Sequence, residues 1–265
     1  MRRVCETMNV LITAGGTSEA IDSVRSITNY STGRLGSIIA DRFACENVSI
    51  TYVCSTNAVL PSSSNVEIVR ISDVQGLLQS IDGLLAKHKF DCVIHTMAVS
   101  DFTPKAVLTL DDIVANIALA VSGHNNLDAA QDLEPGEHRL AEKIHAAVLA
   151  SAKPVSENKI SSKESGLMIM LKQTPKIISR IKAAQPETIL VGFKLLSGTT
   201  EDALLQAASN LLKQNSCDFV LANDLQNIKG DSHKAILINK NGSQKRANTK
   251  QEIAELIYQA ITPRG

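Results

Sequence analysis

The chain has 265 residues, of which 44% are hydrophobic, and its 27 basic and 27 acidic side chains give a formal net charge of zero. This length suits one large α/β domain or two small ones, and the charge balance does not favour nucleic acid or a charged membrane as the main partner. No stretch approaches the roughly 18 apolar residues of a membrane-spanning helix, and five widely spaced cysteines without a CxxC pair favour reduced thiols and a cytoplasmic protein.

The first predicted element is a short apolar strand over residues 9–13, which runs into the adjacent glycines Gly15 and Gly16. A long segment follows before a helix is predicted to begin near Leu35. Turns from strand to helix in α/β proteins usually take about 2–6 residues, and longer ones are often functional. This segment is rich in groups that bind anions and carbonyls, so it predicts a site at the carboxyl end of the first strand.

Further strands alternate with helical patterns along the chain. Apolar residues recur at helical spacing over 74–85, with Ser72 as the predicted cap, and the capping box at 249–252 precedes the last helix. This alternation implies an α/β, Rossmann-like fold, with a mostly parallel sheet and helices on both faces. The predicted strands are 9–13, 48–54, 66–71, 90–95, 188–193, 218–222 and 235–239.

The middle of the chain differs in composition. Residues 104–158 contain polar and alanine-rich patches, with helices predicted near 111–121 and 138–151. We interpret 104–158 as an insertion or flap over the sheet edge within a single domain of residues 8–265. Residues 1–7 are then an N-terminal extension.

A hairpin is predicted directly after this insertion. Residues 159–162 and 167–172 flank the turn sequence KESG, which is favourable hairpin chemistry. We interpret it as a dimerisation extension.

Several predicted strands end in polar or reactive groups. Ligands in open α/β sheets bind outside the carboxyl ends of the strands, so these groups predict a shared pocket. Within them, Asp101 suits a ribose hydroxyl, a base amine, a metal ion or a simple turn. His95 suits a base, but a hydrogen-bonded structural role is favoured. The groups are Thr13–Thr17, His95–Asp101, Phe193–Lys194 and Asn223–Asp224.

Short motifs exclude two common nucleotide sites. The glycines do not form GxGxxG, and no Walker sequence is present. Thr174 and Pro175 predict the N-cap and first position of a helix whose free N–H groups suit a phosphate, although most such starts bind nothing. His138, Glu142 and His145 share one helical face, which we interpret as solvated rather than as a metal site.

The motifs in this order resemble the phosphopantothenoylcysteine synthetase family. TAGGTSEAIDSVRSITNYSTGRLG is similar to the family's glycine-rich opening, and the resemblance runs from about residue 8 to residue 262. The chain looks like the stand-alone bacterial form of the streptococcal type. The later motifs that match are MAVSDFTP, KISS, TPKII, VGFKLL and ANDL.

This resemblance implies a ligase that joins 4′-phosphopantothenate to L-cysteine in coenzyme A biosynthesis. CTP and Mg²⁺ would activate the carboxylate as an acyl-cytidylate, and members of the family are homodimers. Asn29 would hold the acyl intermediate and Lys159 would neutralise the α-phosphate. Arg25, Asn29 and Ala98 match substrate positions, and no metal ligand is assigned. The positions that match nucleotide contacts are Gly15, Gly16, Ser31, Met97, Asp101, Lys159, Pro175, Lys176, Ile177, Ile178, Phe193 and, with a loose alignment, Lys213.

The chain departs from the commonest bacterial pattern. KISS replaces KIKK, so Lys159 and Ile160 are retained but the later lysines are not, and FKLLSG replaces FAAET. FKL, at the start of FKLLSG, also resembles the eukaryotic, ATP-using branch, so CTP is favoured with ATP as the alternative. Two other functions are weighed against the ligase: a nicotinamide-dependent oxidoreductase on a Rossmann-type sheet, and a non-catalytic nucleotide-binding protein.

Overall fold

The computed structural model describes residues 7–45, 47–122, 136–155, 160 and 166–262. The chain divides into two compact units. The first unit contains Met1–Ser18, Thr28–Ser100 and Pro175–Gly265, and the second contains Glu19–Ile27 and Asp101–Thr174.

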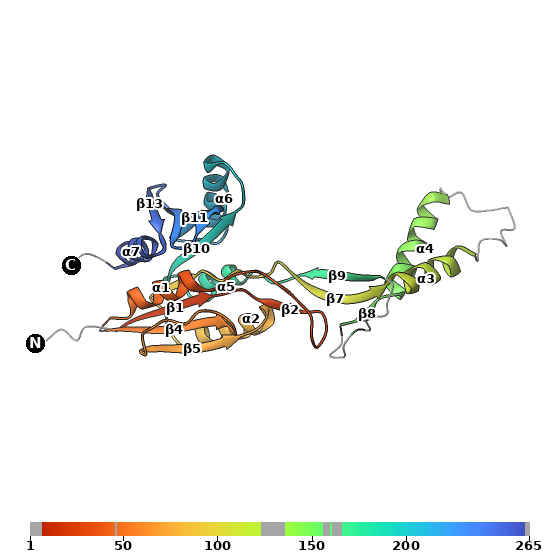
Figure 1. The fold of residues 1–265 in the computed structure, drawn as a ribbon, viewed down its shortest axis with the longest axis horizontal. Coiled ribbons are helices and arrows are strands. Elements are labelled where there is room, and N and C mark those ends of the chain that lie inside the picture. Colours follow the sequence, from red (N-terminus) through yellow and green to blue (C-terminus); the bar gives the residue numbers. More distant parts are fainter. Residues whose placement is uncertain (1–6, 46, 123–135, 156–159, 161–165, 263–265) are drawn as a thin grey trace, which may run out of the picture. The chain divides into compact units, whose positions relative to one another are not determined.

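Within its described residues, the first unit holds an eight-stranded sheet in the order β13-β12-β11-β10-β6-β1-β4-β5 (Figure 1). Neighbouring strands from β5 to β11 are parallel, whereas β12 and β13 pair antiparallel at one edge. The order of the parallel strands reverses between β1 and β6, which is the point where doubly wound sheets bind ligands. The strands are β1 (Met8–Ala14), β4 (Val48–Ser55), β5 (Val66–Ile71), β6 (Cys92–His95), β10 (Ile189–Leu196), β11 (Phe219–Lys229), β12 (Ser232–Asn239) and β13 (Gln244–Thr249).

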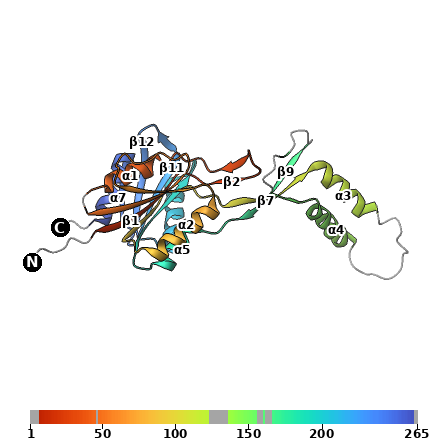
Figure 2. The same ribbon diagram turned by 90° about the horizontal axis from the view of Figure 1, so that it is seen from below.

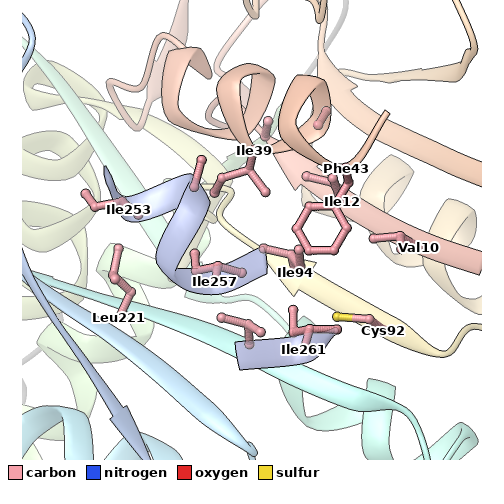
Figure 3. Packing of buried hydrophobic residues seen from close by; sticks show 14 of the residues in the cluster. Val10, Ile12, Ile39, Phe43, Cys92, Ile94, Leu221, Ile253, Ile257 and Ile261 are labelled. Carbon is pink, nitrogen blue, oxygen red and sulfur yellow. The ribbon is translucent and has the colours of Figure 1, made fainter. Parts of the chain in front are cut away.

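Helices cover both faces of this sheet, and each face has its own core. Helices α1 (Arg34–Phe43) and α7 (Lys250–Ile261) pack on one face, where Phe43, Ile39 and Ile257 meet side chains of β1 and β6 (Figure 3). Helices α2 (Val74–Lys87), α5 (Ile177–Ala184) and α6 (Glu201–Gln214) contribute apolar residues to the core on the other face. Because both faces are covered, the central strands are apolar on both sides, as parallel strands usually are. The predicted α/β, Rossmann-like sheet is confirmed, including all seven predicted strands.

Two predicted helix starts are wrong by one or two residues. The N-cap of α2 is Asp73 rather than Ser72, and its carboxylate accepts a hydrogen bond from the N–H of Gly76 at 2.7 Å. Helix α5 begins at Ile177, so neither Thr174 nor Pro175 occupies the predicted position. The capping box of α7 is confirmed, since the Thr249 hydroxyl accepts from the N–H of Glu252 at 3.1 Å.

The second unit contains a three-stranded antiparallel sheet of described residues and a pair of helices. Strand β7 (Phe102–Thr109) lies between β8 (Lys153–Pro154) and β9 (Leu167–Gln173). Helices α3 (Leu110–Ser122) and α4 (Gly136–Ala150) lie side by side (Figure 2). They agree with the helices predicted near 111–121 and 138–151.

The second arm of the predicted hairpin is a strand, β9, but its described partner is β7. The first arm lies outside the described residues except for Ile160, which is not in a strand.

A short ribbon interrupts the long connection between β1 and α1. Strands β2 (Ser18–Ala20) and β3 (Ser26–Thr28) pair with each other. The carboxylate of Asp22 closes the turn between them by accepting the N–H groups of Val24 at 2.9 Å and Arg25 at 2.8 Å. The connection is therefore folded locally, as a long functional loop usually is.

Candidate active site

The two adjacent glycines shape the turn at the carboxyl end of β1. Gly15 has a φ of 89°, in the left-handed region, and a Cβ there would lie 2.1 Å from Oγ of Ser55. A Cβ on Gly16 would lie 1.9 Å from the carbonyl oxygen of Asn29. Gly15 therefore requires glycine because of its positive φ, and Gly16 because a Cβ would overlap a backbone atom.

This turn pairs with the segment that follows β6. The carbonyl of Gly15 accepts from the N–H of Ala98 at 2.9 Å, and the N–H of Thr17 donates to the carbonyl of Ala98 at 3.2 Å. Gly16 and Ala98 also form a parallel β-bridge. The glycine turn and Ala98, which were predicted to belong to one site, are therefore direct neighbours at the point where the strand order reverses.

Asn29 is held at the same place by its backbone and its side chain. Its N–H donates to the carbonyl of Thr17 at 3.2 Å, and its Nδ2 donates to the carbonyl of Val99 at 3.1 Å. Its Oδ1 accepts from Oγ of Ser100 at 3.1 Å, and the N–H of Ser100 donates to Oγ1 of Thr17 at 2.9 Å. The structure thus brings Asn29, the predicted catalytic residue, together with the segment that contains Ala98.

Met97 and His95 support this segment from within the core. The N–H of Met97 donates to Oγ1 of Thr13 at 3.3 Å, and the same oxygen lies 2.9 Å from Nδ1 of His95. Burial lowers the pKa of His95 to about 4, so the ring is neutral at neutral pH. The environment of His95 fits the structural role that the sequence favours.

At some residues predicted to bind the nucleotide, the side chain packs in the core and only the backbone could contact a ligand. Ile177 is buried, and a Cβ on Gly192 would lie 3.2 Å from Cδ1 of Ile178, so both isoleucines pack in the core below the start of α5. A phosphate at this helix start would therefore meet backbone N–H groups. Pro175 and Lys176 are exposed beside them, whereas Ser31 and Phe193 are half-buried.

Lys213 does not join these residues. It lies in the last turn of α6, just before the amino end of β11, whereas the glycine turn follows the carboxyl end of β1. Helix α6 has 14 residues and is about 20 Å long. It runs from the carboxyl end of β10 to the amino end of β11, so its last turn lies at the end of the strands opposite the glycine turn. Lys213 is therefore not part of the proposed site.

Arg25 is anchored within the second unit. Its Nη1 lies 3.3 Å from Oδ2 of Asp22, and its Nη2 donates to the carbonyl of Ile160 at 3.4 Å. The N–H of Ile160 donates to Oδ2 of Asp22 at 3.1 Å. The hydrogen bond from the N–H of Val24 is the main reason why the pKa of Asp22 lies below its usual value, and the N–H groups of Ile160 and Arg25 act in the same direction. Ile160 is therefore held at both its N–H and its carbonyl.

Two other predicted site residues, Asp101 and Lys159, belong to the second unit. The carbonyl of Asp101 accepts from the N–H of Thr174 at 3.0 Å, and the Asp101 side chain is exposed. Lys159, the second predicted catalytic residue, lies outside the described residues.

The strand-end segments predicted from the sequence include Thr17 and Ser100, whereas the buried Asp22 of the second unit was not predicted. Thr17, Ser100 and Asp22 have exposed fractions of 0%, 3% and 5%. The contacts of Ser100 with Thr17 and of Ile160 with Asp22 were not predicted, because each joins residues far apart in the sequence. The described parts of the chain contain no group of three or more His, Cys, Asp or Glu side chains that would hold a metal ion.

The chain matches the family described as DNA/pantothenate metabolism flavoprotein C-terminal domain over residues 5–110 and 130–263. The chain belongs to this family. The gap in the match falls on 111–129, which includes most of α3, so the family pattern covers the glycine turn, Asn29 and the segment after β6 but not that helix.

Relatives agree with this assignment. The chain is 30% identical over 257 residues to the coenzyme A biosynthesis bifunctional protein CoaBC of Thermococcus kodakarensis; the alignment covers 97% of this chain and 51% of the relative. The chain thus spans about half the length of that curated relative.

Solved structures share the fold. A DNA/pantothenate metabolism flavoprotein from Streptococcus pneumoniae is 36% identical, with a TM-score of 0.75 and coverage of 96% of this chain and 98% of that one. A complex of the Cab2 H337A mutant with phosphopantothenate-cysteine has a TM-score of 0.64 at 17% identity, over 97% of this chain and 85% of that one, which shows a common fold. In the part of the chain that the structure describes, no helix combines the length and hydropathy of a membrane span.

Proposed function

We propose that this protein is a phosphopantothenate–cysteine ligase. In the first half-reaction, a carboxylate oxygen of 4′-phosphopantothenate attacks the α-phosphorus of CTP, and pyrophosphate leaves. In the second, the amine of L-cysteine attacks the acyl carbon, the bond from that carbon to the CMP oxygen breaks, and the amine loses a proton. CMP and 4′-phosphopantothenoyl-L-cysteine are the products.

The observation that carries this proposal is the fixed amide of Asn29 at the reversal point of the sheet. Its Nδ2 uses one N–H on the carbonyl of Val99 at 3.1 Å. The second N–H is then available to the oxygen of the acyl group, where negative charge develops as the amine attacks. A pre-positioned donor of this kind stabilises the transition state without accepting a proton.

The resemblance to the family supports the roles of the charged residues. Lys159 is proposed to neutralise the α-phosphate during activation, and its sequence neighbour Ile160 is held by Asp22 and Arg25. The Arg25 side chain remains 37% exposed, which leaves part of its guanidinium for an anionic substrate such as phosphopantothenate. A guanidinium suits phosphate because of its planar set of donors.

CTP is the proposed nucleotide, with ATP as the alternative, and the backbone at the start of α5 is its proposed phosphate contact. Mg²⁺ is proposed to arrive on the triphosphate. This is supported by the preference of Mg²⁺ for phosphate oxygens and water.

The homodimer belongs to the same proposal and is supported by β9. This strand is at the edge of its sheet, and Leu167, Met168 and Leu171 are 39%, 53% and 43% exposed. Among the described strands, β9 has a partner on one side only, and an apolar edge of this kind favours pairing with another strand. A second copy of β9 is the proposed partner.

The test is pyrophosphate release with 4′-phosphopantothenate, L-cysteine and either CTP or ATP, with each component omitted in turn. Release that needs both phosphopantothenate and a nucleotide supports the ligase. Nucleotide binding without turnover favours the binding protein, and tight binding of NADH favours the oxidoreductase. Either result overturns the proposal.

Two variants test in which half-reaction Asn29 and Lys159 act. Asn29→Ala is expected to release pyrophosphate but to slow amide formation about a hundredfold, to a rate that can still be measured, with the exposed Asn210→Ala as its control. Alanine is preferable to aspartate here, because a carboxylate would face the carbonyl of Val99. Lys159→Gln is expected to lose pyrophosphate release, with the exposed Lys89→Gln, before β6, as its control. Full amide synthesis by Asn29→Ala would contradict the assigned role.

A further inference from the structure

The orientation of the Asn29 amide follows from its two partners. The carbonyl of Val99 can only accept, so the atom that faces it at 3.1 Å must be Nδ2. The other atom, Oδ1, then faces Oγ of Ser100 at 3.1 Å, and the hydroxyl must donate to it. The two contacts agree with a single orientation of the amide, because a rotated amide would place Oδ1 against the carbonyl oxygen of Val99.

Ser100 is itself firmly held. Its N–H donates to Oγ1 of Thr17 at 2.9 Å, while the carbonyl of Thr17 accepts from the N–H of Asn29 at 3.2 Å. One fully buried threonine thus fixes the backbone of both residues that form the hydroxyl–amide contact. Ser100 is 3% exposed, so water competes little for its hydroxyl.

We propose that Ser100 is a positioning residue for Asn29 in the second half-reaction. The inference rests on the proposed ligase function. By donating to Oδ1, the hydroxyl keeps the amide from rotating, so the second Nδ2–H points in one fixed direction. That N–H meets the acyl oxygen while the cysteine amine forms its bond to carbon and CMP leaves with the electron pair of the broken C–O bond. Ser100 does not touch the substrate.

The alternative, a merely structural role for Ser100, predicts something different. Loss of a buried hydroxyl that only stabilises the fold lowers the amount of active protein and reduces both half-reactions equally. Loss of a positioning contact spares the activation of the carboxylate and slows the transfer to cysteine. The ratio of the two rates therefore separates the roles.

The experiment measures both half-reactions in single turnovers, with pyrophosphate release for the first and amide formation after addition of cysteine for the second. Ser100→Ala is expected to keep pyrophosphate release within about twofold and to slow amide formation about tenfold, which corresponds to about 1.4 kcal/mol, the scale of one hydrogen bond. Ser100→Thr keeps the hydroxyl and should restore most of the transfer rate. Ser37→Ala is the matched control, because Ser37 is 4% exposed and its hydroxyl donates to the carbonyl of Arg34 at 2.9 Å, within α1.

A double-mutant cycle with Asn29→Ala completes the test. If Ser100 acts through Asn29, then Ser100→Ala has no further effect on amide formation once Asn29 is alanine. Additive losses, or equal losses in both half-reactions of Ser100→Ala, overturn the inference. If the unmodified enzyme releases no pyrophosphate, the proposed function fails instead, so the two failures are distinguishable.

Discussion

The hydroxyl oxygen of Thr13 lies 2.9 Å from Nδ1 of His95, and the two residues are paired positions of β1 and β6. Both side chains are buried, with exposed fractions of 0% and 7%. The contact joins the two strands between which the sheet reverses its order. It places a titratable ring in the interior directly below the proposed active site.

Acidification is expected to destabilise the protein through this histidine. The unfolded ring takes up a proton below its ordinary pKa of 6.5, whereas burial holds the folded ring neutral down to about pH 4, so the unfolded state binds more protons between these values. Between about pH 7 and about pH 5 this removes about 2 kcal/mol from the free energy of unfolding. Urea unfolding of the protein and of His95→Gln at both pH values measures the difference.

A second buried histidine, His233, is expected to make a similar contribution to the loss of stability on acidification. Burial, and then the charge of Lys250, lower its pKa to about 4 as well. Each of His95→Gln and His233→Gln should therefore remove about half of the pH dependence, with the exposed His145→Gln as control. A His95→Gln protein that loses stability as steeply as the unmodified one would show that His95 is not held neutral.

Gly16→Ala is expected to abolish ligase activity and to destabilise the fold. The new Cβ would lie 1.9 Å from the carbonyl oxygen of Asn29, so the backbone of Asn29 must move away from Thr17 and Val99. Overpacking of this kind costs about 1–3 kcal/mol. The control is Gly83→Ala in the interior of α2, where a Cβ meets nothing within 4 Å and should stabilise the protein by up to about 1 kcal/mol. An active, stable Gly16→Ala protein would refute the close approach.

Met168→Lys tests the proposed dimer. The charge is expected to prevent a second copy of β9 from pairing with this apolar edge, and the protein should become monomeric in light scattering. Leu225→Lys is a matched control, because Leu225 is 52% exposed and Met168 is 53% exposed, and Leu225 lies on β11 in the first unit. A dimer that survives Met168→Lys would place the interface elsewhere.

Apolar runs were sufficient to predict the central parallel strands β1, β4 and β6, because these strands are buried on both faces. Strand β13 lacks that signal: its sequence is QKRANT, and only Ala247 is buried. Strand β7 was not predicted, because residues from 104 onward were assigned to an insertion on their composition. It contains Pro104, where the register of β7 and β9 shifts before Ala106.

The location of the candidate site was predictable from the sequence, but the side-chain contacts within it were not. Strand ends and glycines are visible in the sequence, and the reversal between β1 and β6 brings Gly15, Gly16 and Ala98 together. The contact of Asn29 with Ser100 spans 71 residues and depends on the direction of one hydroxyl, for which the sequence holds no signal.

Asp22→Asn is expected to slow pyrophosphate release about tenfold or more. The carboxylate accepts from the N–H groups of Val24, Arg25 and Ile160, and an amide nitrogen in place of Oδ2 would face the N–H of Ile160 at 3.1 Å and the guanidinium of Arg25. Hydrogen bonds to a charged group contribute about 1.5–3 kcal/mol, and their loss frees Ile160, the sequence neighbour of Lys159.

The matched control is Asp41→Asn, since Asp41 accepts two loop N–H groups at 2.8 and 3.0 Å. Stopped-flow measurement of pyrophosphate compares the two variants. Equal rates would show that the contact of Asp22 with Ile160 does not support the first half-reaction.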